Sequence, residues 1–293
     1  MPLTRSRAGF TLVELLIALT LLGIVGAVTV RLLSDTQRVT TAQGERAHMQ
    51  ATTRVGALVM PTELREINPA MGDITAMSDT SIEYRGMRNL GISCTAPTPT
   101  SVVLWASSVG GLRPFAANDS VLVFVEVDKN EDIDDRWGLA AIQNVSNGTA
   151  CPGGQPSVTL ALSPANGGMQ YQDAPGTAVV GSELLTGAPV RAFEHATMST
   201  YTDAGGDNWL ALKIGTGGNW EPLVGPLPST NGIVLSYFDA LGNVTATTTL
   251  VRSIGIEIRG ETTRPVYGRG GTVNGPQLLT DTLSTRITLR NAL

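Results

Sequence analysis

Residues 10–30 of this chain read FTLVELLIALTLLGIVGAVTV, and they stand between a short head, MPLTRSRAG (1–9), and RLL (31–33). Glu14 is the one charged side chain within this segment of twenty-one residues. A helix of about twenty apolar residues is roughly 30 Å long, which is the thickness of the hydrocarbon core of a bilayer. Residues 10–33 are therefore predicted to form a transmembrane helix.

The two arginines of the head, Arg5 and Arg7, predict the orientation of this helix. Basic residues beside the first span tend to stay in the cytoplasm, so the chain beyond residue 33 is expected on the far side. A cleaved secretory signal peptide is the ordinary alternative, but its apolar core has only about 7 to 15 residues and ends at a small-residue cleavage site. The segment here is longer, and no such site follows it cleanly.

Glu14 is the feature that a plain membrane anchor does not explain. A charged side chain inside the bilayer costs about 2.5 to 3.5 kcal/mol on insertion scales. Carboxylates in such positions usually have a function and a cationic partner. We therefore expect Glu14 to pair with a positive charge.

The sequence GFTLVE (9–14) behind a short basic leader resembles the processing site of type IV prepilins and of type II secretion pseudopilins. The resemblance implies that a prepilin peptidase cuts between Gly9 and Phe10 and methylates the new amino terminus at Phe10. Gly9 suits such a cut, because it has no side chain to obstruct the protease. The resemblance also implies assembly through Glu14, whose carboxylate would pair with the amine of Phe10 in a neighbouring subunit.

The same resemblance implies the partners and the location of the protein. The expected partners are the prepilin peptidase, other pilins or pseudopilins that contact the amino-terminal helix, and an assembly platform in the inner membrane. The expected location is the bacterial inner membrane, crossed once with the amino terminus in the cytoplasm and the head in the periplasm. From there the mature subunit would enter a pilus or pseudopilus filament.

Beyond the span, residues 34–67 are polar, with apolar residues returning every three, four or seven positions, which predicts an amphipathic stalk helix. Pro61 is expected to kink or end this helix, because proline lacks a backbone donor. Short β-type runs separated by glycine and proline follow, so residues 68–293 are predicted to form a β-rich extracytoplasmic head. The expected fold class is α+β, with a leader (1–9), a long transmembrane and stalk helix, and a pilin-like globular head.

The predicted strands of the head are 81–85, 102–106, 121–127, 139–145, 158–162, 190–198, 210–214, 233–238, 251–259 and 282–289. A turn of the Asp, Gly and Asn type at residues 239–243 is expected to join 233–238 to a further β-type run at 244–249.

Composition limits the possible functions. The chain has 293 residues, 15% charged residues and a formal net charge of −5. No basic cluster occurs after the span, so direct binding of nucleic acid is not expected. No sequence motif of a metalloprotease, a P-loop or a serine nucleophile occurs, and the two histidines, His48 and His195, lie on a predicted helix and a predicted strand. An enzyme is not expected, and no cofactor is required.

Cys94 and Cys151 are the two cysteines of the chain, and both lie beyond the span. In an oxidising compartment they are expected to form a disulfide, with two free buried thiols as the alternative. Major pilins that this chain resembles often have their disulfide near the carboxyl end, whereas here the cysteines lie mid-chain. A minor component is favoured by this position, by the size of the head, and by the similarity of residues 237–243 and 252–259 to the carboxyl half of W-type minor pilins and J-type pseudopilins.

Residues 128–135, DKNEDIDD, follow a predicted strand and place side-chain oxygens at every second position. Calcium takes six to eight oxygen ligands, so Asp128, Asn130, Asp132 and Asp134 are a candidate calcium site. Ile133 occupies the position of the usual turn glycine, and Leu139 that of the usual final glutamate. A solvated acidic loop is the alternative.

The function that these features predict is that of a minor type IV pilin-like subunit, which is processed after Gly9 and primes or enters a filament. A minor pseudopilin of type II secretion is one alternative. A membrane-anchored adhesive or binding module is another, with Trp209, Trp220 or the acidic loop as the contact surface. For the tryptophans, the reading that we favour over adhesion is that they cover the edge of the sheet.

Overall fold

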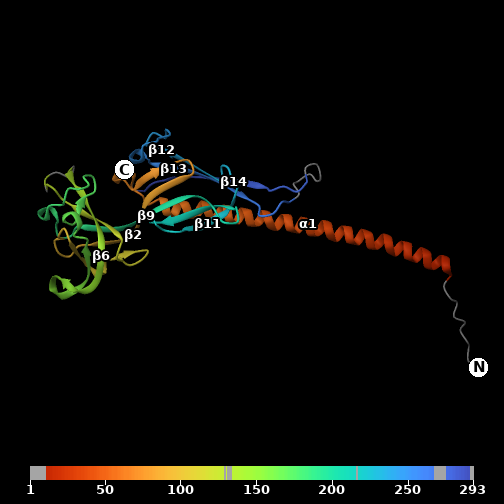
Figure 1. Ribbon diagram of the computed structural model, residues 1–293, viewed down its shortest axis with the longest axis horizontal. Coiled ribbons are helices and arrows are strands. Elements are labelled where there is room, and N and C mark those ends of the chain that lie inside the picture. Colours follow the sequence, from red (N-terminus) through yellow and green to blue (C-terminus); the bar gives the residue numbers. More distant parts are fainter. Residues whose placement is uncertain (1–10, 129, 131–133, 216, 267–274, 291–293) are drawn as a thin grey trace, which may run out of the picture.

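The computed structural model describes residues 11–128, 130, 134–215, 217–266 and 275–290. Its first element is a single helix, α1 (Leu12–Leu64), of 53 residues. The predicted transmembrane segment and most of the predicted stalk thus form one continuous rod, which is roughly 80 Å long at a rise of 1.5 Å per residue. Figure 1 shows the first part of α1 projecting away from the head.

The second half of α1 packs on the head through a narrow stripe. It contacts β11 (Trp220–Leu227), β13 (Ser253–Glu261) and β14 (Thr280–Thr288). Spacings of three, four and seven residues place the buried positions on one face of the helix. These positions are Ala42, Met49, Thr53, Gly56, Met60 and Leu64.

Antiparallel strands form two sheets in the described part of the chain. The larger sheet has eleven strands. Its main path is β1-β2-β9-β5-β6-β7-β3, and off this path β10 pairs with β9, β11 with β10, β4 with β2, and β8 with β6. The smaller sheet has the order β12-β13-β14. The remaining bounds are β1 (Ile74–Met77), β2 (Ser81–Ile92), β3 (Ser101–Trp105), β4 (Gly110–Gly111), β5 (Ser120–Val125), β6 (Arg136–Cys151), β7 (Gln155–Leu162), β8 (Gln170–Tyr171), β9 (Pro189–Thr202), β10 (Asn208–Ile214) and β12 (Ile233–Phe238).

The described residues of the head form two hydrophobic cores, and we call the regions around them the proximal and the distal lobe. The proximal lobe combines the end of α1 with β1, β10, β11 and the smaller sheet. The distal lobe consists of residues 93–188, between β2 and β9, and includes β3 to β8. Strand β9 contributes to both cores, because Val190 and Ala192 lie in the distal core and Ala196 and Met198 lie in the proximal core. In Figure 1 the distal lobe lies beyond the end of α1.

The β13–β14 hairpin lies along α1, as Figure 1 shows. Near its open end, the backbone N–H of Arg290 donates to the carbonyl of Arg65 at 2.8 Å. Nearer its turn, the backbone N–H and the hydroxyl of Thr263 donate to Oε2 of Glu45 at 3.0 and 2.6 Å. Strand β14 therefore runs in the same direction as α1, away from the exposed first half of the helix.

The structure confirms the α+β fold class and differs from the predicted elements at particular places. Helix α1 continues through Pro61 to Leu64. Proline removes only its own backbone donor, while Arg65 still donates to the carbonyl of Pro61 at 3.0 Å and Leu64 is fully buried. Burial of this last turn outweighs the missing hydrogen bond.

The predicted turn at residues 239–243 is confirmed, since the backbone N–H of Asp239 donates to the carbonyl of Asn243 at 2.9 Å. The run at 244–249 is not a strand, and β12 pairs with β13 instead. That run is rich in threonine and has no apolar face to bury. Strand β11 was not predicted from the sequence, because it contains Pro222 and Pro226. It lies at an edge, where a strand tolerates proline.

Candidate functional site

The first half of α1 has an apolar surface that the head does not cover. Every described residue from 11 to 33 is exposed, and Leu12, Leu22 and Leu32 are between 66% and 79% exposed. By length and composition α1 can cross a membrane. An apolar surface of this size needs lipid or other apolar helices around it.

Glu14 closes the amino-terminal end of α1. The hydroxyl of Thr11 accepts a hydrogen bond from the backbone N–H of Glu14 at 3.3 Å, and the Glu14 carboxylate accepts one from the backbone N–H of Thr11 at 3.4 Å. This reciprocal pair is a capping box, which satisfies two donors that the helix leaves free. The carboxylate therefore lies beside the backbone that follows Phe10. Gly9 and Phe10 themselves lie outside the described residues.

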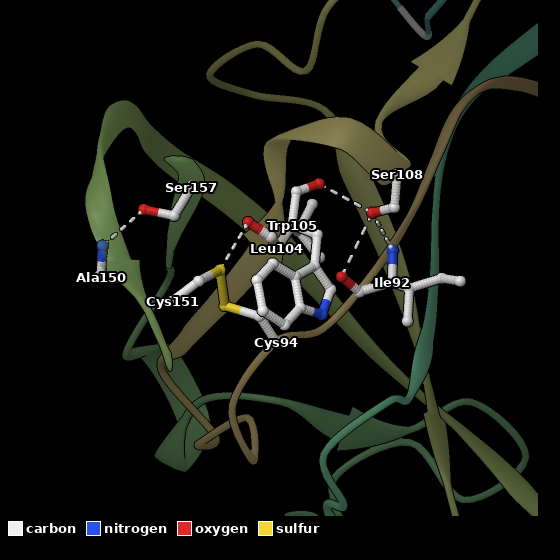
Figure 2. Close-up of a disulfide and its surroundings, with 8 residues drawn as sticks. All are labelled: Ile92, Cys94, Leu104, Trp105, Ser108, Ala150, Cys151 and Ser157. Carbon is white, nitrogen blue, oxygen red and sulfur yellow. Dashed lines mark hydrogen bonds between the residues drawn. A yellow bond between two sulfur atoms is a disulfide. The ribbon is translucent and has the colours of Figure 1, made fainter. Parts of the chain in front are cut away.

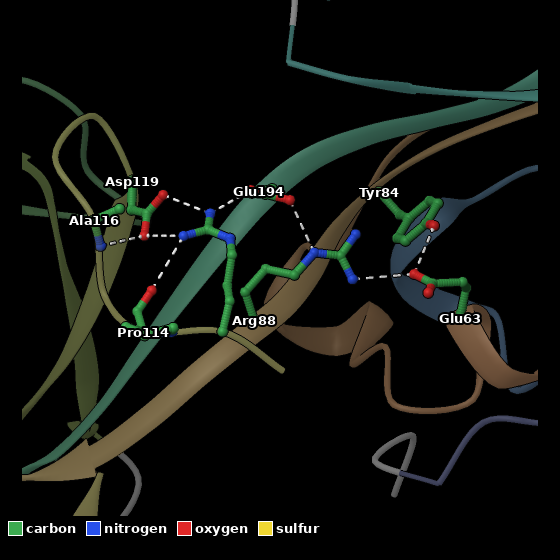
Figure 3. Close-up of polar contacts among 8 residues, drawn as sticks. Glu63, Tyr84, Arg88, Pro114, Ala116, Asp119 and Glu194 are labelled. Atoms are coloured by element: carbon green, nitrogen blue, oxygen red, sulfur yellow. Dashed lines mark hydrogen bonds and ion pairs between the residues drawn. The ribbon is translucent and has the colours of Figure 1, made fainter. Parts of the chain in front are cut away.

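At the other end of α1, Glu63 anchors the helix to the head. Nη1 of Arg88, on β2, lies 3.1 Å from Oε2 of Glu63, and the hydroxyl of Tyr84 donates to the same oxygen at 3.4 Å (Figure 3). The Arg88 side chain is only 11% exposed. Burial, and then the nearby negative charge of Glu63, raises the pKa of Tyr84, which therefore stays a hydrogen-bond donor.

The contacts continue from Arg88 into the distal lobe. Nε of Arg88 donates to Oε2 of Glu194, on β9, at 2.9 Å, and the other oxygen of Glu194 pairs with Arg113. Arg113 binds Asp119 through two hydrogen bonds of 2.9 and 2.7 Å. We call these five alternating charges, from Glu63 to Asp119, the ion-pair chain.

The two arginines of the ion-pair chain, Arg88 and Arg113, hold their protons more tightly than free arginines do. Hydrogen bonds with Asp119 raise the pKa of Arg113 above its ordinary value, and those with Glu194 add to the effect. Burial alone would lower the pKa of Arg88, but its hydrogen bonds with Glu194 and Glu63 outweigh burial and raise it. The ion-pair chain thus connects the end of α1 to both lobes through charge-assisted hydrogen bonds.

The predicted disulfide between Cys94 and Cys151 is confirmed (Figure 2). Cys94 follows β2 and Cys151 ends β6, so the bond joins the entry of the distal lobe to the far end of its longest strand. Both cysteines are buried. The backbone N–H of Cys94 also donates to the carbonyl of Val103, on β3, at 2.8 Å. The bond therefore secures the base of the distal lobe.

The structure brings the predicted calcium ligands together only in part. Asp132 lies outside the described residues. Oδ1 of Asp128 accepts hydrogen bonds from the backbone N–H and the amide of Asn130 at 3.0 and 2.9 Å, which is a local turn. Within the described ranges, no three His, Cys, Asp or Glu residues gather closely enough to hold a metal ion. Calcium binding by this loop stays a prediction.

Trp209 and Trp220 lie on β10 and β11, and both are partly buried. Nε1 of Trp209 donates to Oδ2 of Asp203 at 2.9 Å. Trp220 stacks on Tyr201 with 6.0 Å between ring centroids. Both indoles are thus engaged within the head, as expected for side chains that cover a sheet.

The ion-pair chain is the feature that the sequence did not predict. Its members lie between residues 63 and 194, in α1, in β2, in β9 and in the segment between β4 and β5. In the sequence each is an ordinary surface-type charge, and no local spacing pairs them. The only available signal was the excess of arginine over lysine, which is the common choice for buried ion pairs.

Comparison with protein-family models matches residues 4–30 to the prokaryotic N-terminal methylation motif. The match covers Gly9, Phe10 and Glu14, together with most of the exposed apolar half of α1. Searches of curated proteins and of solved structures found no match. The amino-terminal segment of this chain therefore carries the methylation motif that is typical of type IV prepilin-like proteins.

Proposed function

We propose that this protein is a minor type IV pilin-like subunit, which is cut after Gly9, methylated at Phe10 and assembled into a filament through α1. The observation that carries the proposal is the position of the motif. It covers residues 4–30, at the start of a 53-residue helix whose first half remains outside the head. A subunit that first resides in a membrane and then joins a bundle of helices needs such an uncovered surface.

In this proposal Glu14 selects processed subunits for assembly, because its carboxylate pairs with the amine that the cut creates. In the single chain its carboxylate accepts the backbone N–H of Thr11, at 3.4 Å. A cut after Gly9 would create a positive amine at Phe10, one residue before Thr11. That amine, from the same chain or from a neighbour, offers the carboxylate a charge-assisted partner in a medium of low dielectric constant.

The large head supports a low-copy position, at the tip or at the start of a filament. The distal lobe of residues 93–188 extends beyond the end of α1, so it would be repeated along the filament if every subunit carried it (Figure 1). The same geometry also suits a subunit of the short filament of type II secretion. A minor pseudopilin is therefore the second candidate, and the two differ in which filament the protein is recovered from.

The experiment is a comparison of Glu14→Ala with the native chain in cells that produce the filament. We expect both chains to lose residues 1–9, because the cut precedes the helix. We expect only the native chain to be recovered with sheared filaments. The matched control is Thr11→Ala, which removes the capping hydroxyl but keeps the carboxylate. Equal recovery of Glu14→Ala and the native chain would contradict the role of Glu14.

A further inference from the structure

We propose that the free edge of β14 is a docking site for an extended acidic segment of another protein, which adds to the smaller sheet as an antiparallel strand. The inference concerns the surface of the head. It does not depend on processing at Gly9.

The backbone of β14 points half of its hydrogen-bonding groups away from the sheet. Leu289 donates to the carbonyl of Arg252, and Thr262 donates to that of Leu279, both at 3.0 Å. In an antiparallel pair the backbone groups of successive residues point alternately toward the partner strand and away from it. These two bonds show that the backbone groups of the odd-numbered residues of β14 bond to β13, so those of the even-numbered residues point away from the sheet. In the described part of the chain, no backbone group accepts the N–H of Ser284, Arg286 or Thr288.

Between residues 282 and 288 this edge lacks most of the devices that usually prevent strands from pairing; beyond it, the outward N–H of Arg290 is taken by the carbonyl of Arg65 at the end of α1. The register with β13 runs over nine residues without a shift, and β14 contains neither proline nor lysine. Three other edges of the head carry such devices: β11 contains Pro222 and Pro226, β4 has two residues, and β1 has four residues with a register shift. A long, regular and exposed edge is a template for another strand.

A groove beside this edge gives an added strand a second surface to contact. It lies between α1 and β14 and has a volume of 390 Å³. On its helix side Leu58 is 70% exposed, next to Ala57 and Pro61. Leu283 of β14 is 36% exposed. An added strand would cover these apolar side chains while its backbone pairs with β14.

The charges around the groove favour an acidic segment. Glu66 is already paired with Arg290, at 3.0 Å. Arg286 donates to the hydroxyl of Ser253 at 2.8 Å and stacks on the ring of Phe238, both of which are uncharged. Among the described residues no carboxylate forms an ion pair with Arg286 or Arg65, so the groove keeps an excess of positive charge.

A second copy of this chain does not fit the edge. Antiparallel pairing of β14 with itself requires one molecule to be turned end over end. Because β14 runs in the same direction as α1, the two helices would then point in opposite directions. Two subunits anchored in one membrane through α1 cannot adopt this arrangement. Antiparallel pairing of β14 with β14 of a second anchored copy is therefore excluded, and the occupant that we propose is a segment of a different protein.

The test uses the full chain in detergent micelles and a capped synthetic peptide of about ten residues in which glutamate alternates with valine. A second peptide carries lysine in place of each glutamate. Fluorescence anisotropy measures binding, and hydrogen exchange followed by mass spectrometry locates it. We expect the acidic peptide to bind, and to slow exchange at residues 280–288 and not at β11. Absence of binding, equal binding of the lysine peptide, or protection elsewhere would overturn the proposal.

Two variants at one position separate backbone pairing from nonspecific charge attraction. Ser284→Pro removes an outward N–H that an edge strand does not need for folding, whereas Ser284→Val keeps it. We expect Ser284→Pro to weaken binding about tenfold and Ser284→Val to bind like the native chain. Equal binding by two folded variants would contradict strand addition. If Ser284→Pro fails to fold, the exchange pattern of the native chain with the two peptides decides the question.

Discussion

Gly56 of α1 lies against Ile258 of β13, so close that a Cβ on Gly56 would be 2.8 Å from Cδ1 of Ile258. Both methyl groups of Val224, on β11, would lie 3.3 Å from the same Cβ. At this contact α1 packs against a strand of each sheet. The close approach explains why a glycine occurs at a buried position of a helix, where it is otherwise unfavourable.

Replacing Gly56 by leucine should destabilise the head by about 1 to 3 kcal/mol, because the larger side chain must push the helix away from Ile258 and Val224. The matched control is Gly44→Leu, since a Cβ at Gly44 meets nothing within 4 Å. That change should be neutral or stabilise by up to about 1 kcal/mol, because leucine favours the helix over glycine. Urea unfolding of the full chain in micelles, followed by tryptophan fluorescence, measures both. Equal effects of the two variants would mean that Gly56 is not a packing constraint.

Arg88→Met should cost about 2 kcal/mol of unfolding free energy, less than the 3 to 5 kcal/mol of a fully buried pair, because Glu63 and Glu194 keep some contact with water. Their side chains are 25% and 22% exposed. The control Arg290→Met breaks a pair in which the arginine is 66% exposed, and it should cost at most about 1 kcal/mol. If Arg88→Met is no worse than Arg290→Met in the same unfolding experiment, the ion-pair chain does not hold the helix to the head.

Removing the disulfide should loosen the distal lobe before the proximal lobe. Cys94 and Cys151 are 57 residues apart, and closing a loop of this length stabilises by about 4 kcal/mol in the chain-entropy model. The bond lies at the base of a lobe with its own core. Limited proteolysis of the Cys94→Ser/Cys151→Ser variant should therefore give new cuts within residues 93–188 and leave α1 and the smaller sheet intact. New cuts spread over both lobes would show that the two cores unfold together.

The carboxyl of Asp73 should make stability depend on pH. It is buried, and burial raises its pKa above the ordinary value of 3.8, although Arg191 and the backbone N–H of Asn68 oppose the shift. The folded state thus holds the proton more tightly than the unfolded chain. The stability that this group contributes to the folded state is fully present below pH 3.8, and it is lost as the pH rises through the pKa that Asp73 has in the folded state. Relative to Asp73→Asn, the native chain should lose stability between about pH 3 and about pH 7.

Asp239 provides a control of opposite sign for this measurement. Hydrogen bonds from the backbone of Asn243 and of Leu241 lower the pKa of its carboxyl. Relative to Asp239→Asn, the native chain should therefore gain stability as the pH rises from about 3 to about 7. If the native chain also gains relative to Asp73→Asn over this range, Arg191 keeps Asp73 ionised and our assignment is wrong.

The sequence predicted the architecture because its strongest patterns are local. The apolar run at 10–30 and the amphipathic spacing after it specify α1, and alternating runs such as 233–238 specify strands. The division of the head into two lobes was not predicted. It depends on which strands pair over long distances, as β2 does with β9, and no local pattern contains that information.

For the candidate site, the sequence predicted residues that a local motif identifies, and it missed residues whose role depends on partners far away in the sequence. Glu14 stands out because a carboxylate is costly in an apolar segment. Arg88 does not stand out, since its partners Glu63 and Glu194 are distant in sequence. The exposed edge of β14 was equally invisible, because 282–289 was predicted as a strand without any indication of which side remains free.

The most direct test of the central claim is the mass of the mature chain, purified from the membranes of cells that contain prepilin peptidase. We predict a chain that begins at Phe10 and carries a methyl group on its amino terminus. Fragment masses of the first peptide would place both changes at one residue. A chain that retains residues 1–9, or one cut beyond the apolar segment of α1, would contradict a pilin-like function.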